Sequence, residues 1–214
     1  MRNKKKITSI ILAGMLLISI MLTLSGCGAS KSSAVSKSSS AGSSSSAGSS
    51  SSAGSSSSAG SSTGVLVKSS DGSMSISVPT GWNTNNTSLW AAAQIGVSNG
   101  TNYPYLVVIK KPKSNYAAGY TIDDYMTGQH SVFALLLTNP VWGQNSSVTI
   151  GGLSGLTAQL SGTGKASKDN LRYLISVLGD NNNFYEIVGW TTASTADADM
   201  QIIANITNSF KLEG

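Results

Sequence analysis

The segment between Gly28 and Gly64 limits the fold of this chain more than any other, because it is built almost entirely from Ser, Ala and Gly. The unit Ala-Gly-Ser-Ser-Ser-Ser repeats within it, and no face of that repeat is apolar enough to be buried. Such a composition cannot offset the entropy lost on ordering, so residues 27–64 are predicted to form a disordered linker. The residues after this linker, 65–214, number about 150 and suffice for one domain with a single hydrophobic core.

A secretory signal is predicted before the linker, in residues 1–26. The segment from Arg2 to Lys6 is basic, and the segment from Ile10 to Leu24 is apolar. That apolar run is shorter than the ~20 residues that a membrane-spanning helix needs. Two small residues then precede Cys27, as at a signal-peptide cleavage site.

The segment Leu24-Ser25-Gly26-Cys27 resembles the lipobox of bacterial lipoproteins. The resemblance implies cleavage before Cys27 and attachment of a diacylglyceryl group, with palmitate-type chains, to its sulfur. Two acyl chains are enough for stable membrane attachment. We therefore expect a lipid-anchored protein on the extracytoplasmic side of the cell membrane. The alternative is an uncleaved anchor in which the cysteine is coincidental.

Much of the basic charge lies in the segments before the predicted domain. The formal net charge is +5, but six of the 14 basic residues precede Val65, which leaves eight basic residues against nine acidic ones. A nucleic-acid-binding domain carries a basic patch on its folded part, so nucleic acid is not expected as a partner. Cys27 is the only cysteine, which excludes a disulfide within the chain and a cysteine-based metal site.

Hydrophobic periodicity predicts a β-rich domain. Met74, Ile76 and Val78 alternate with serines, which is typical of a half-buried strand. The polar segment 179–183 predicts a turn that joins the last two strands into an antiparallel hairpin. The predicted strands are residues 65–67, 74–78, 89–97, 105–110, 147–150, 156–160, 171–178 and 184–191.

Two amphipathic helices are predicted between and after these strands. The first is expected to begin at Thr121, with Asp124 as its capping partner, and to end at Asn139-Pro140. The second is expected to begin at Ser194 as the N-cap residue. Its apolar stripe consists of Met200, Ile203, Ile206 and Phe210. Two such helices can cover one or both faces of an antiparallel sheet, which gives an α+β fold class.

Three segments occur in a fixed order along residues 65–214: the strand leading into Pro79-x-Gly81-Trp82, the hairpin strand Phe184-Tyr185-x-Ile187-Val188-Gly189, and the closing helix Ile203-x-x-Ile206-x-x-Ser209-Phe210. Together they resemble the PsbP/Mog1-like superfamily, in particular small bacterial PsbP-like lipoproteins. The resemblance implies an α/β/α sandwich around an antiparallel sheet. It also implies a binding, assembly or accessory role without catalytic activity. The matched positions are structural, so the resemblance assigns no functional residue.

The sequence contains no pattern typical of catalysis, metal binding or cofactor binding. His130 is the only histidine, and no serine lies in the Gly-x-Ser-x-Gly elbow of hydrolases. We therefore expect a non-enzymatic protein with no cofactor. The alternative is a cell-wall-directed hydrolase, which needs His130 and a carboxylate to meet in a cleft.

The candidate binding residues are aromatic and lie close to Asn, Gln or Gly in the sequence: Tyr103, Tyr105, Tyr116, Tyr120 and Trp142. Such side chains can stack on a polar ligand such as a sugar, and loops on a rigid scaffold commonly carry binding residues. The alternative is that these rings close the edges of the sandwich. The predicted function is a binding, interaction or accessory module of the cell envelope. Its expected partner is a cell-wall polymer, a sugar or an envelope protein.

Overall fold

The computed structural model describes residues 64–86, 89–100 and 102–214. Cys27, the predicted signal segment and residues 28–63 of the predicted linker lie outside these ranges. The main sheet of the described part has seven strands in the order β3-β4-β9-β8-β7-β5, with β6 paired to β7, and all pairs are antiparallel. Its strands are β3 (Ile95–Asn99), β4 (Asn102–Pro112), β5 (Leu137–Trp142), β6 (Ser146–Ile150), β7 (Leu153–Gly164), β8 (Asn170–Gly179) and β9 (Asn183–Thr192).

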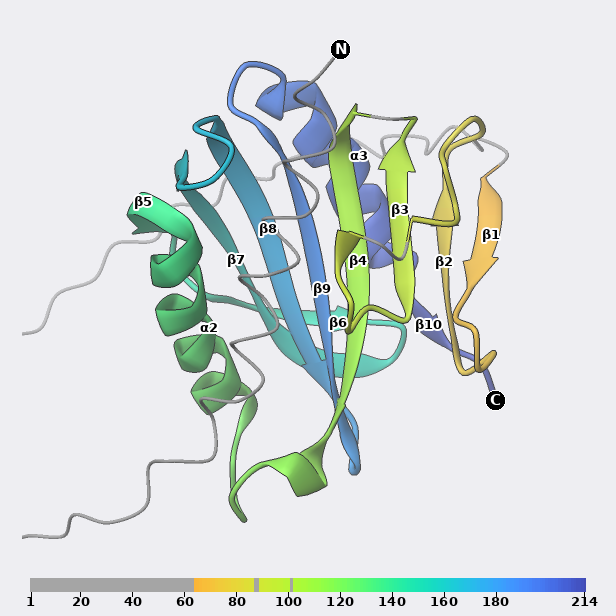
Figure 1. The fold of residues 1–214 in the computed structure, drawn as a ribbon. Coiled ribbons are helices and arrows are strands. Elements are labelled where there is room, and N and C mark those ends of the chain that lie inside the picture. Colours follow the sequence, from red (N-terminus) through yellow and green to blue (C-terminus); the bar gives the residue numbers. More distant parts are fainter. Residues whose placement is uncertain (1–63, 87–88, 101) are drawn as a thin grey trace, which may run out of the picture.

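One α-helix covers each face of this sheet in the described part of the chain (Figure 1). Successive side chains of a strand point to opposite faces. Phe184 and Val188 of β9 therefore pack on the side of α2 (Ile122–Leu136), while Tyr185 and Ile187 pack on the side of α3 (Ala196–Asn208). The predicted α+β fold class, with an antiparallel sheet between two helices, is confirmed. A short 3-10 helix, η3 (Lys113–Asn115), follows β4.

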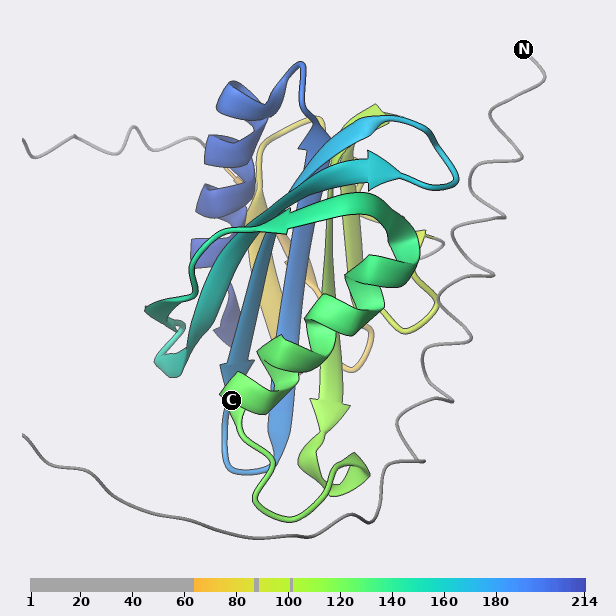
Figure 2. The ribbon, with the colours of Figure 1, turned by 90° about the vertical axis from the view of Figure 1, so that its left-hand side faces the viewer.

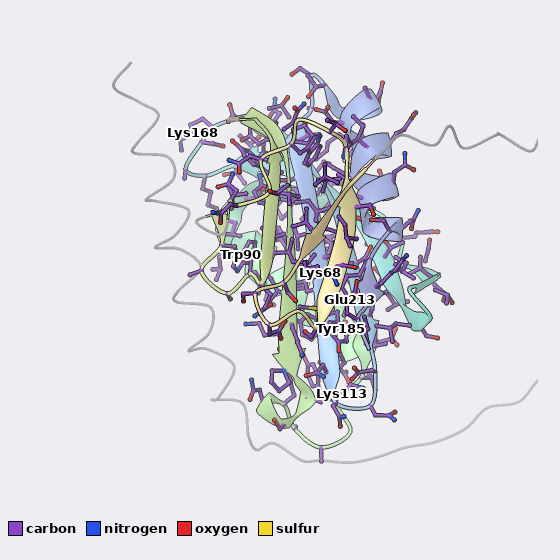
Figure 3. The ribbon with its side chains drawn as sticks, turned by 90° about the vertical axis from the view of Figure 1, so that its right-hand side faces the viewer. Lys68, Trp90, Lys113, Lys168, Tyr185 and Glu213 are labelled. Carbon is purple, nitrogen blue, oxygen red and sulfur yellow. The ribbon has the colours of Figure 1, made fainter. Side chains whose placement is uncertain are left out.

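A second sheet has three strands and lies on the α3 side of the main sheet (Figure 1). Its buried side chains share one hydrophobic core with those of α3. This second sheet consists of β1 (Val65–Lys68), β2 (Met74–Val78) and β10 (Lys211–Leu212), with β2 in the centre. Met74, Ile76 and Val78 are buried as the alternation predicts, but Ser75 is buried as well. Ser75 is covered because it lies between Lys68 of β1 and Lys211 of β10 in the ladder. The ion pair between Lys68 and Glu213, at 3.3 Å, lies on the outer side of this sheet (Figure 3).

The predicted start of the first helix is confirmed, and its predicted end is wrong. The side-chain oxygen of Thr121 accepts a 3.1 Å hydrogen bond from the backbone N–H of Asp124, and the Asp124 carboxylate accepts one of 2.9 Å from the backbone N–H of Thr121. The helix nevertheless ends at Leu136, before Asn139-Pro140, because the chain turns directly into β5. Proline is tolerated there because β5 is an edge strand, and its pairing with β7 is interrupted between Thr138 and Val141.

The predicted cap of the second helix is also wrong. Thr195 occupies the N-cap position of α3 without a side-chain capping bond. Ser194 instead lies one residue earlier, with its hydroxyl 2.9 Å from that of Thr192. Gly189 of β9 lets α3 approach the sheet closely, because a Cβ atom there would lie 2.2 Å from Cγ2 of Ile203. Phe210 lies beyond the helix end at Asn208 but is fully buried, so the apolar stripe is used as predicted.

The predicted strand over residues 89–97 is wrong in its first half, because β3 begins only at Ile95. The preceding residues form a turn in which the backbone N–H of Ala93 donates to the carbonyl of Trp90 at 2.9 Å. Alanine has a low preference for strands, so the alanines of residues 91–93 do not hold this segment in the sheet. The turn instead places Trp90 against the core on the α2 side.

Candidate functional site

A row of aromatic side chains crosses three neighbouring strands on the α2 face of the sheet. Tyr105 of β4 lies opposite Trp190 of β9, which lies opposite Tyr173 of β8. The ring centroids of Tyr105 and Trp190 are 5.3 Å apart, and those of Trp190 and Tyr173 are 6.3 Å apart. Tyr103 adds an edge-to-face contact with Tyr105 at 4.9 Å. The antiparallel register thus gathers residues that are far apart in the sequence into one aromatic surface.

Tyr103, Tyr173 and Trp190 of this surface form one wall of a cavity of about 220 Å³ at the C-terminal end of α2. Figure 2 shows that end of α2 beside the loop between β7 and β8. The aromatic lining consists of Trp90, Tyr103, Phe133, Tyr173 and Trp190. Leucines supply most of the other apolar lining, namely Leu135, Leu136, Leu137 and Leu171. Leu135 is 63% exposed, so an apolar side chain stands at the surface beside the cavity.

The loop after β7 supplies the polar part of the lining through Lys165 and Ser167. The backbone N–H of Lys165 donates to the carbonyl of Leu136 at 2.9 Å, and its ammonium donates to the carbonyl of Ala134 at 2.8 Å. These two bonds tie the loop to the last turn of α2. The hydroxyl of Tyr103 donates to the carboxylate of Asp169 at 3.3 Å. Burial, followed by the charge of Asp169, raises the pKa of Tyr103, so this phenol stays protonated at neutral pH.

A second polar group lies on the same face of the sheet, near the N-terminal end of α2. Glu186 of β9 is only 3% exposed, and its Oε2 atom accepts a 2.9 Å hydrogen bond from the hydroxyl of Tyr125. Its Oε1 atom has no hydrogen-bond partner among the described residues. Burial raises the pKa of Glu186 from 4.5 to about 7, although the Tyr125 bond and the charge of Lys111 lower it.

The structure separates the predicted binding residues into different places. Tyr103 lines the cavity, and Tyr105 packs beside it. Tyr116 and Tyr120 stack on each other at 4.8 Å and pack against Phe184. Their place near the start of α2 is at the other end of the helix from the cavity. A ligand in the cavity would therefore touch Tyr103 but neither Tyr116 nor Tyr120.

Trp142 at the end of β5 packs against the outer part of α2. Its ring stacks on that of His130 at 4.0 Å with an interplanar angle of 11°, and it meets Phe133 edge to face at 5.8 Å. His130 is exposed on α2 and, within the described ranges, makes no hydrogen bond or ion pair with a carboxylate. No group of three His, Cys, Asp or Glu side chains in these ranges could hold a metal ion. Whether any of the predicted residues binds a ligand stays a prediction.

Sequence reasoning missed most of the cavity lining and the buried acid. Trp190 and Tyr173 lie within long strands, and nothing in the sequence around them distinguishes them from core residues. Trp90 fell inside a strand prediction that was wrong. Glu186 did leave a signal, because a single carboxylate interrupts the apolar run from Phe184 to Trp190. A charged residue in a strand that is buried on both faces needs a specific partner.

The sequence matches none of the protein families and none of the curated proteins with which it was compared. Solved structures with a similar arrangement include cyanobacterial PsbP from Synechocystis (13% identity, 75% of this chain and 98% of that one, TM-score 0.48). They also include LpqN, which is involved in cell envelope biogenesis of Mycobacterium tuberculosis (13% identity, 70% and 90%, TM-score 0.48). A third is a protein from Bacteroides thetaiotaomicron (12% identity, 71% and 49%, TM-score 0.49), so this chain spans about half of that protein's length.

None of the helices in residues 64–86, 89–100 and 102–214 is long and apolar enough to cross a membrane.

Proposed function

We propose that this protein is a non-enzymatic binding module of the cell envelope, anchored to the membrane by lipid on Cys27, and that it takes a small, largely apolar ligand into the cavity beside α2. The observation that carries the proposal is the cavity of about 220 Å³ with its lining of aromatic rings and leucines. Binding sites for small molecules are concave and mostly apolar, with a few polar groups that fix orientation. The cavity has this composition.

The size of the cavity limits the ligand. An apolar cavity of about 150 Å³ is enough to hold benzene. A cavity of about 220 Å³ therefore suits one or two fused rings or a short branched chain. Burial of apolar surface contributes about 25 cal/mol per Å², so a ligand of this size gains most of its affinity from contact with the rings.

The predicted anchor and linker support a role at the membrane surface. The lipobox-like segment ends at Cys27, and the Ser, Ala and Gly-rich segment separates it from the domain. A flexible coil of this length has a root-mean-square span of roughly 30–37 Å. The domain would then meet ligands within a few nanometres of the membrane, where the attached protein is concentrated.

The test is isothermal titration calorimetry of the domain with indole, a neutral fused ring of the appropriate size. Ala166 is exposed and lines the cavity, so Ala166→Trp should fill it and weaken indole binding at least tenfold. Ala118 is also exposed but lies in the loop before α2, so Ala118→Trp is the matched control and should bind like the wild type. Equal binding by wild type and Ala166→Trp, or no binding by the wild type, would overturn the proposed site.

A further inference from the structure

We infer that the ligand of the cavity is an organic anion, with an apolar ring system inside and a carboxylate or similar anionic group that pairs with Lys165 at the surface. This inference rests on the proposed function and specifies its ligand class. It follows from how the ammonium of Lys165 is held, from the charges around it, and from the apolar lining beneath it.

The ammonium of Lys165 is fixed in position and still has donors to offer. Lys165 is exposed and also lines the cavity, so its side chain lies where the cavity meets solvent. Its Nζ atom donates to the carbonyl of Ala134 at 2.8 Å, which is its only hydrogen bond within the described ranges. A lysine ammonium carries three donors. Two of them therefore remain for a ligand, and the bond to Ala134 reduces the entropy that is lost when an anion binds.

The bond to α2 has a structural role that does not conflict with ligand binding. The C-terminal end of a helix carries a partial negative charge, and cations there are favourable. The last turn of α2 contains no basic residue of its own, so Lys165 supplies this cation from the β7–β8 loop. The same geometry holds a positive charge at the edge of an apolar cavity, where an anion is less well solvated and the attraction is stronger than in open solvent.

The other charges of the loop leave a net positive balance. Lys168 is exposed in the same loop, and Figure 3 shows it at the end of the molecule opposite to Lys113. The carboxylate of Asp169 opposes these cations but accepts the hydrogen bond from Tyr103. Two lysines against one carboxylate favour an anionic ligand over a cationic one. No acidic side chain is among the residues that line the cavity.

The lining disfavours a neutral sugar inside the cavity. A sugar ring carries hydroxyl groups on all sides, and each buried hydroxyl without a partner costs about 1–3 kcal/mol. The rings of Trp90, Phe133 and Trp190 and the neighbouring leucines offer few acceptors or donors to such groups. A ring system with one charged substituent avoids this cost, because only the substituent needs polar partners and Lys165 lies at the cavity edge.

The experiment compares three indoles that share one ring system and differ in charge: indole-3-acetate, indole and tryptamine. Calorimetry at low, constant ionic strength should show that the wild type binds the acid about tenfold more tightly than indole, and tryptamine more weakly than indole. Lys165→Met should remove the preference for the acid while indole binding persists, and Lys165→Arg should keep most of it. Lys211→Met, on β10, makes the same charge change in an exposed residue of the second sheet and should leave the preference intact.

The outcomes separate this inference from the proposed function. Equal affinity of the wild type for acid and indole, or an unchanged preference in Lys165→Met, overturns the anionic ligand but leaves the cavity as a binding site. Tighter binding of N-acetylglucosamine than of any indole would also overturn it. If the wild type binds none of these compounds, the proposed function fails as well. Retained indole binding shows that Lys165→Met is folded.

Discussion

The hydroxyl of Tyr125 on α2 donates a 2.9 Å hydrogen bond to the buried carboxylate of Glu186 on β9. This bond joins the helix to a central strand of the sheet, since β9 lies between β4 and β8. The other carboxylate oxygen of Glu186 has no partner within the described ranges. A buried carboxylate with one hydrogen bond is incompletely compensated when it is ionised, so the stability of the domain should depend on its protonation.

The first prediction is a loss of stability as pH rises. Burial raises the pKa of Glu186 from 4.5 to about 7 in the folded state. The folded state therefore holds this proton more tightly than the unfolded state, and the stabilisation is complete below pH 4.5 and lost as pH rises through 7. A shift of this size corresponds to about 3 kcal/mol. Urea denaturation of the domain between pH 4.5 and 8 should show the free energy of unfolding falling over this interval.

Two variants test whether Glu186 is responsible. Glu186→Gln should flatten the dependence between pH 4.5 and 8, because the neutral amide has no proton to lose. Tyr125→Phe removes a hydrogen bond that lowers the pKa of Glu186, so the fall in stability should move to higher pH. An unchanged pH profile in Glu186→Gln would assign the effect to other groups and contradict the prediction.

The capping box at the start of α2 provides a second prediction. Thr121→Ala removes the acceptor for the backbone N–H of Asp124 and should lower the free energy of unfolding by about 1 kcal/mol. Ser131→Ala is the control, because Ser131 is exposed within the same helix and alanine has the higher helix propensity. Thermal unfolding should therefore show a lower Tm for Thr121→Ala only. Equal Tm values for Thr121→Ala and the wild type would show that the cap contributes little.

Local patterns in the sequence predicted the elements that depend on local interactions. The helix start at Thr121 needs only residues within one turn, and the β8–β9 hairpin needs only its polar turn between two apolar runs. The second sheet was not predictable in this way. It pairs Lys211 with Ser75 through a strand of two residues, and such a short strand has no periodicity of its own.

The cavity was not predictable from local patterns either, because its lining depends on how the strands pair. Tyr103 was predicted as a candidate because it is an aromatic residue beside Asn102, just before a predicted strand. Trp190 and Tyr173 become part of the same surface as Tyr105 only through the pairing of β4 with β9 and of β9 with β8. That pairing is non-local, and no spacing within one strand reports it. The polar edge of the cavity depends equally on the contact between Lys165 and the end of α2.

A third prediction concerns the close packing of α3 on the sheet. Gly189→Ala places a methyl group within 2.2 Å of the Ile203 side chain, so helix and strand must move apart. Overpacking of this kind typically costs 1–3 kcal/mol. Chemical denaturation should show that loss for Gly189→Ala. Combining it with Ile203→Ala should give a smaller loss than the sum of the two single variants, because the second change removes the clashing atoms. Strict additivity would show that the two residues do not compete for space.

The predicted membrane anchor is tested by Cys27→Ala in the full-length chain. The thiol of Cys27 is the proposed attachment point of the diacylglyceryl group, and no other cysteine can replace it. Metabolic labelling with a palmitate analogue should mark the wild type and not the variant, and the mature wild type should fractionate with membranes. Ser25→Ala is the control, because it keeps a small residue before Cys27 and should still be labelled. Labelling that persists in Cys27→Ala would rule out the thioether anchor and, with it, the predicted mode of attachment to the membrane.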